Sequence, residues 1–172
     1  MTNVCFVVIC IACSLIFANS QSMSEHSQSS DLQADRVLVE KKARHMILFS
    51  KGKPIREYTI ALGRSPEGPK IQEADCKTPE GNYFIESRDR KSRYHANLRI
   101  SYPNSFDYRR SKELGVKPGG DIMIHGLRKG FGWVGRIHRL IDWTKGCIAV
   151  TNEEIEEILR LVPNGTPVEI RP

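Results

Sequence analysis

The stretch Asp142-Trp143-Thr144-Lys145-Gly146-Cys147-Ile148-Ala149-Val150 is the most informative part of the sequence. It places Cys147 after a hydroxyl residue and a glycine, at a sharp turn that enters a short apolar run. Upstream, another apolar run, Asp121-Ile122-Met123-Ile124, leads into His125 and Gly126. Neighbouring strands would bring this thiol and this imidazole together, and a nearby imidazole or imidazolium raises the thiolate fraction. We therefore expect Cys147 to be a nucleophile and His125 its general base.

These residues resemble the motif of the L,D-transpeptidase catalytic domain, the YkuD-type fold of bacterial cell-wall enzymes. In that motif a His is followed, after a spacer, by Ser/Thr-x-Gly-Cys, and the matching positions here are His125, Thr144, Gly146 and Cys147. The stretch 77–84 (KTPEGNYF) resembles the family's Thr-Pro-x-Gly turn before a strand. The resemblance covers residues 35–172, which we take as the catalytic domain. It implies a mainly β fold, a mixed β-sandwich with a C-terminal helix packed on it.

Three positions depart from the family pattern. The spacer between His125 and Cys147 is a few residues longer than usual, which a surface loop absorbs because closure entropy grows slowly with length. Lys145 stands where many members carry a second His, and Ala149 stands where Arg or Asn is usual. The missing Arg or Asn leaves open what finally receives the acyl group.

The resemblance implies an enzyme that acts on peptidoglycan stem peptides. Cys147 would form a thioester with a stem tetrapeptide, release D-Ala and pass the acyl group to an amine of another stem or of a wall-attached protein. One alternative is hydrolysis of the same thioester, by an L,D-carboxypeptidase or amidase. Another, of a different class, is a non-catalytic cell-wall-binding module. No metal or organic cofactor is expected, and we expect a monomer.

Several further residues are candidates for the site. Backbone N–H groups around Gly146 would face a developing oxyanion, and Thr144 would bond within the turn or position the sulfur. His138 is a rival base, or a lid or substrate residue. Candidate substrate-binding residues are Gly126, Trp143, His138, Arg136, Arg139 and Lys145, the three cations replacing the missing Arg. Trp143 is equally well read as a core anchor.

Other residues near the motif are candidates for a lid, for support of the site and for the wall of the cleft. The Gly- and aromatic-rich stretch 130–135, which contains Trp133, is a candidate mobile lid. Asp142 would orient a histidine, neutralise Arg136 or Arg139, or cap a turn. Candidates for the opposite wall of the cleft are Arg93, Tyr94 and Arg99.

The N-terminus is expected to be a targeting segment. Residues 4–17 are apolar and short for a membrane span, and small residues at 18–20 favour cleavage before Gln21. We predict a signal peptide over 1–20 and a flexible, Ser- and Gln-rich linker over 21–34. An uncleaved anchor and lipidation at Cys13 remain alternatives. All three place the domain in the periplasm or cell envelope.

Charge and cysteine content narrow the possible functions. The formal net charge of +6 suits an anionic polymer or membrane surface, whereas the lack of aromatic–basic alternation argues against nucleic acid. After leader removal only Cys76 and Cys147 remain, so a disulfide between them is an alternative to a free nucleophile. His125, His138, Asp142 and Cys147 match no compact zinc motif.

The remaining sequence predicts a β-rich domain. Strands over 36–40 and 44–49 and an alternating apolar run over 55–62 predict a meander. Further strands are expected over 82–87 and 122–124, and 97–103 is read as a strand or a cleft-lining segment. A short helix is expected over 106–114. Thr151 and Glu154 form a capping-box pattern before a helix that ends at Pro163. Residues 166–170, which include Pro167, are expected to form an edge-like strand.

Overall fold

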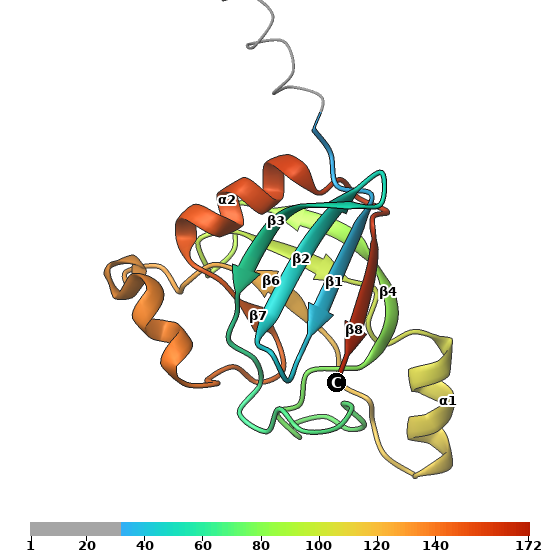
Figure 1. Ribbon diagram of the computed structural model, residues 1–172. Coiled ribbons are helices and arrows are strands. Elements are labelled where there is room, and N and C mark those ends of the chain that lie inside the picture. Colours follow the sequence, from blue (N-terminus) through green and yellow to red (C-terminus); the bar gives the residue numbers. More distant parts are fainter. Residues whose placement is uncertain (1–31) are drawn as a thin grey trace, which may run out of the picture. The chain divides into compact units, whose positions relative to one another are not determined.

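The computed structural model describes residues 32–172, and the predicted signal peptide and most of the predicted linker lie outside this range. The domain contains eight strands, two α-helices and one 3-10 segment (Figure 1). The elements are β1 Arg36–Glu40, β2 His45–Ser50, β3 Lys53–Thr59, β4 Gly81–Asp89, β5 Asn97–Ile100, α1 Ser105–Glu113, β6 Met123–His125, η1 Gly132–Leu140, β7 Ile148–Ala149, α2 Asn152–Leu161 and β8 Pro167–Arg171. In this range no helix has the length and apolarity that a membrane crossing requires.

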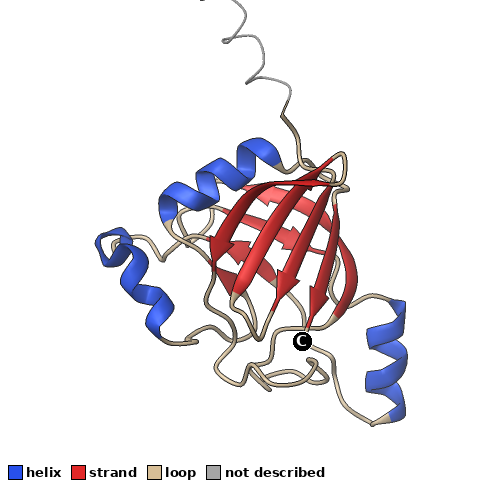
Figure 2. Cartoon of the chain, in the orientation of Figure 1, coloured by secondary structure: helices blue, strands red, loops and turns tan. Residues whose placement is uncertain are grey.

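The strands form one continuous sheet in the order β3-β2-β1-β8-β4-β5-β6-β7. The sheet curls so that its two halves face each other across the core (Figure 2). Ala61, just beyond β3, bridges Ala149 of β7 with two backbone hydrogen bonds of 3.0 and 2.8 Å. The two ends of the sheet order therefore meet beside the turn that carries Cys147. The mainly β prediction is confirmed.

The position of β8 corrects one expectation. β8 lies inside the sheet, parallel to β1 and antiparallel to β4, so it is not an edge strand. Pro167 is tolerated because it is the first residue of β8, and the parallel pairing with β1 begins only at Val168.

Helix α2 lies along one end of the curled sheet and packs its apolar face into the core, as the C-terminal helix was expected to do (Figure 1). Thr151 caps it: the side-chain oxygen accepts from Glu154 N–H, and the Glu154 carboxylate accepts from Thr151 N–H. Ile155, Ile158 and Leu159 are buried on one face, at the spacing of an amphipathic helix. The predicted capping box and apolar face are both present.

Two buried lysines fix the long loop between β3 and β4. Lys41 donates to the carbonyls of Gly68 and Thr78 and pairs with Glu80 at 2.7 Å. Lys70 pairs with Asp75 at 2.7 Å, and the Asp75 carboxylate also accepts three backbone N–H groups of the same loop. Because the buried charges are matched, the loop is held against the sheet without regular secondary structure.

Candidate active site

Two parallel strands bring Cys147 and His125 to one end of the sheet. β6 pairs with β7 in the register Ile124–Ile148 and His125–Ala149, and Cys147 directly precedes β7. The Cys147 sulfur lies 3.5 Å from the carbonyl oxygen of Asp121 and is partly exposed. As predicted, His125 at the end of β6 and Cys147 just before β7 are carried by neighbouring strands.

Thr144 organises the turn before Cys147. Its hydroxyl oxygen accepts the Gly146 N–H at 3.0 Å and donates to the Cys147 carbonyl at 2.7 Å. Gly146 has φ 128°, and a Cβ there would lie 2.5 Å from the Lys77 carbonyl oxygen. Only glycine fits this position, both for backbone conformation and for space.

Gly63 and Thr78 pack against this turn, a contact that the sequence did not predict. A Cβ on Gly63 would lie 2.1 Å from the Cys76 carbonyl oxygen and 3.0 Å from the Gly146 Cα. Gly63 N–H donates to the hydroxyl of Thr78, which is fully buried. The Thr-Pro turn was recognised in the sequence, but its contact with the nucleophile turn depends on tertiary structure.

His125 is held in one tautomer. Its side chain is fully buried, and Nδ1 lies 2.6 Å from the Gly126 carbonyl oxygen. A carbonyl oxygen only accepts, so Nδ1 carries the proton and Nε2 of the neutral ring presents a lone pair. Within residues 32–172 this Nε2 has no hydrogen-bond partner. The Gly126 carbonyl therefore orients the ring.

Aromatic rings enclose the imidazole. Tyr94 stacks on His125 with ring centroids 3.9 Å apart, and Trp143 meets it edge-on at 5.7 Å. Trp143 Nε1 also lies 3.4 Å from Nδ1 of His138, which is itself buried. Trp143 thus contacts both histidines, and within the described chain His138 forms no hydrogen bond with the Cys147 sulfur.

Burial governs the protonation of both reactive groups. It lowers the pKa of His125 to about 4 and raises the pKa of the Cys147 thiol above its ordinary value. Both shifts disfavour the charged form, as desolvation does. At neutral pH the resting pair is therefore thiol and neutral imidazole. A neutral imidazole is the form that can accept the thiol proton, as the predicted general base must, so ionisation of the sulfur would accompany proton transfer to the ring.

The predicted substrate-binding cations lie in different settings. Arg139 is largely buried and ion-paired with Glu154 of α2, whereas Arg136 and Lys145 are exposed. Arg93 is exposed, and its guanidinium carbon lies 5.3 Å from the Tyr94 ring centroid. Its positive charge adds to the lowering of the His125 pKa and opposes, without reversing, the rise that burial causes in the Cys147 pKa. The roles of all four in holding a substrate remain predictions.

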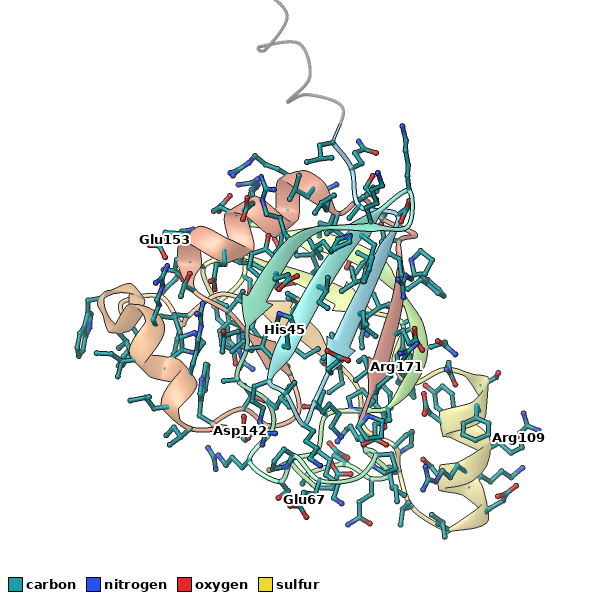
Figure 3. All side chains as sticks on the ribbon, in the orientation of Figure 1. His45, Glu67, Arg109, Asp142, Glu153 and Arg171 are labelled. Carbon is teal, nitrogen blue, oxygen red and sulfur yellow. The ribbon has the colours of Figure 1, made fainter. Side chains whose placement is uncertain are left out.

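Asp142 does not contact a histidine. Its carboxylate pairs with Arg44 at 2.7 Å and accepts the Leu62 N–H at 2.8 Å, five residues before Cys147. Asp142 is labelled in Figure 3. It therefore ties that turn to the β1–β2 connection. The expected pairing with Arg136 or Arg139 is wrong, because Arg44, 98 residues away in the sequence, takes its place.

Gly126 is required for packing as well as for its carbonyl. A Cβ there would lie 2.8 Å from a methyl of Ile155 and 2.9 Å from Oδ1 of Asn152. The same Oδ1 accepts the Leu127 N–H at 2.9 Å. Asn152, at the start of α2, thus fixes the chain just after the imidazole, and no motif in the sequence pointed to it.

Cys76 and Cys147 are both free. The disulfide that was the alternative to a nucleophilic Cys147 is not formed. In the described part of the chain, no three His, Cys, Asp or Glu side chains cluster as metal ligands would.

Comparison with known proteins identifies the family. The family model of the L,D-transpeptidase catalytic domain (YkuD) matches residues 34–170, and the chain belongs to this family. Escherichia coli (strain K12) YafK, whose name assigns it to the L,D-transpeptidases, is 32% identical over 108 residues, which are 61% of this chain and 36% of YafK.

Solved structures agree with this assignment. The helical cell shape determining protein Pgp2 from Campylobacter jejuni is 26% identical with a TM-score of 0.62, over 82% of this chain and 48% of Pgp2. An L,D-transpeptidase from Mycobacterium smegmatis shares the fold, with a TM-score of 0.54 at 12% identity over 81% of this chain and 59% of its own. The chain thus spans about a third to three fifths of the length of these relatives.

Proposed function

We propose that this domain is a peptidoglycan L,D-transpeptidase that acts through Cys147. The Cys147 sulfur attacks the carbonyl carbon of the diamino-acid residue of a stem tetrapeptide, and His125 Nε2 takes the thiol proton. The tetrahedral intermediate collapses to a thioester, and His125 returns the proton to the departing D-Ala amine. An amine of a second stem, or of a wall-attached protein, then attacks the thioester and releases the sulfur.

One observation carries this proposal: the imidazole beside the Cys147 turn has Nδ1 fixed on the Gly126 carbonyl and Nε2 free of partners. That tautomer is the one a general base needs, because the basic nitrogen is the one without a proton. We assign the oxyanion to the N–H of Cys147, since the N–H of Gly146 is already used by Thr144. The leader, the periplasmic or envelope location and monomeric action belong to the same proposal.

Hydrolysis is the second candidate, and one contact favours it. Ala149, where the family usually has Arg or Asn, is fully buried and exchanges two hydrogen bonds with Ala61. This position therefore offers no polar side chain to hold an acceptor. With a loosely held acceptor, water would resolve the same thioester and the products would be shortened stems.

The test is product analysis with purified protein and tetrapeptide muropeptides, read by mass spectrometry. Transpeptidation gives cross-linked dimers, and hydrolysis gives shortened monomers alone. Cys147→Ala should abolish both, whereas Cys76→Ala, the matched control on the other free cysteine, should keep turnover. A Cys147→Ala protein that still turns over muropeptides would refute the mechanism. If Cys147→Ala still bound sacculi and wild type gave no product, the wall-binding alternative would stand instead.

A further inference from the structure

Exposed apolar side chains concentrate on one short segment. Within residues 32–172, five of the nine exposed large apolar side chains lie between 131 and 141, and Trp133 and Leu140 are 81% and 80% exposed. We call this set the 131–141 surface, and its members are Phe131, Trp133, Ile137, Leu140 and Ile141. The segment projects from the side of the domain opposite α1 (Figure 1). Such a concentration marks an interaction site more often than a single exposed residue does.

The inner side of this segment is already occupied. His138 is buried, and Arg139 pairs with Glu154 of α2, so η1 is attached to the domain through these two side chains. η1 is interrupted at Gly135, where φ is 50° and ψ is −132°; Trp133 before this break and Ile137 and Leu140 after it are all exposed. The outer side of η1 therefore has no partner within the described domain.

Within the segment 126–147 itself, the charges are almost all positive. Arg128, Lys129, Arg136 and Lys145 are exposed and form no ion pair within residues 32–172. Asp142 is the only acidic residue between 126 and 147, and Arg44 neutralises it. The excursion between His125 and Cys147 thus combines exposed aromatic and aliphatic side chains with unpaired cations.

We propose that the 131–141 surface docks on an anionic phospholipid bilayer. Tryptophan and aliphatic side chains partition into the interfacial region, and flanking cations are attracted to anionic headgroups. A second copy of this chain is a poorer occupant, because a two-fold contact would place the unpaired cations of both copies together. Docking would hold the mouth of the Cys147 site close to the membrane surface. The inference does not depend on which reaction the site performs.

Fluorescence of Trp133 tests the proposal directly. The chain has two tryptophans, so Trp143→Phe leaves Trp133 as the only one. Residues 1–20 contain no tryptophan and are the same in every variant, so they add no tryptophan fluorescence. With phosphatidylglycerol vesicles we expect a blue shift, quenching by lipids brominated in their acyl chains, and loss of both effects in molar salt. Phosphatidylcholine vesicles should give much weaker effects.

Paired variants in that background separate the contributions. Ile137→Ser with Leu140→Ser should abolish the quenching, whereas Phe106→Ser with Leu114→Ser, an exposed apolar pair on α1, should leave it unchanged. Neutralising Lys129 and Arg136 to Gln should weaken partitioning about fivefold for each charge. Arg109→Gln on α1 is the matched control (Figure 3).

Two results would overturn the proposal. One is an unchanged Trp133 spectrum with phosphatidylglycerol vesicles at low salt. The other is a blue shift that needs no lipid and grows with protein concentration, which would assign this surface to self-association. Circular dichroism of each variant shows that a lost signal is not lost folding.

Discussion

Tyr94 lies flat on His125, with ring centroids 3.9 Å apart and planes inclined by 20°. Tyr94 stands just before β5 and bridges Arg128, which begins the excursion after β6. The phenol ring covers one face of the imidazole, whose other surroundings are also buried. Tyr94 is therefore a positioning residue, because it fixes the plane of the proposed base and keeps water from it.

Replacing this ring should alter the base measurably. Tyr94→Leu should lower kcat by up to about tenfold, since a stacked aromatic pair contributes about 0.5–1.5 kcal/mol. It should also raise the pKa of His125 from about 4 towards 6.5, because water then reaches the ring. Tyr94→Phe should change neither quantity. NMR titration of His125 beside steady-state kinetics makes the comparison, and a Leu variant with unchanged pKa and kcat would remove the positioning role.

Stability should decline as the pH falls below neutrality. The pKa of His125 is about 6.5 in the unfolded chain and about 4 in the folded one, so the unfolded state binds more protons between these values. The stabilisation is fully present above pH 6.5 and is lost as the pH falls to 4, by roughly 3 kcal/mol. Burial also lowers the pKa of His138, which adds in the same direction.

Urea unfolding at pH 7, 5.5 and 4 measures this loss. His125→Gln should flatten the dependence, and His138→Gln should flatten it less. A wild-type protein equally stable at pH 7 and pH 4 would show that His125 is not held neutral by the fold.

The hydroxyl of Thr144 should matter more than its methyl group. Thr144→Val keeps the shape but leaves the Gly146 N–H and the Cys147 carbonyl without the partner they have now. A loss of about 1–3 kcal/mol in unfolding free energy and at least tenfold in kcat/KM is expected. Thr144→Ser should retain most of both. Equal behaviour of the Val and Ser variants would argue against this role of the hydroxyl.

Two glycines at the turn should not accept a methyl group. Gly146→Ala and Gly63→Ala place a Cβ 2.5 and 2.1 Å from a carbonyl oxygen, so each should lose more than about 2 kcal/mol of stability and most activity. Gly120→Ala is the matched control, because a Cβ there meets nothing within 4 Å. Thermal unfolding ranks the three, and a tolerated Gly63→Ala would show that the turn has room to move.

Local patterns accounted for most of the secondary structure. Apolar runs predicted β1, β2 and β4 within two residues of their observed bounds, whereas β3 spans Lys53–Thr59 rather than 55–62. The Thr151–Glu154 capping box predicted the start of α2. The pairing of β6 with β7 agrees with two apolar runs, one that ends at His125 and one that begins after Cys147. These features depend on residues close together in the sequence, so periodicity and capping patterns are enough to predict them.

Features set by distant residues could not be predicted in the same way. The Arg44–Asp142 pair joins segments 98 residues apart, and the interior position of β8 depends on β1 rather than on its own composition. Tyr94 was assigned to the opposite wall, but its stacking on His125 is a tertiary contact. The directions in which the pKa values of His125 and Cys147 shift could not be predicted either, because burial sets them and motifs do not encode burial.

The interior position of β8 has a consequence for how the domain acquires its structure. β1 and β8 are adjacent in the sheet although almost the whole domain separates them in the sequence. Contacts of such separation slow folding, because a long loop must close before they form. The sheet stays open until residues 167–171 have arrived. β1 and β4 therefore have no partner on the sides that face β8 until the last residues of the domain are in place.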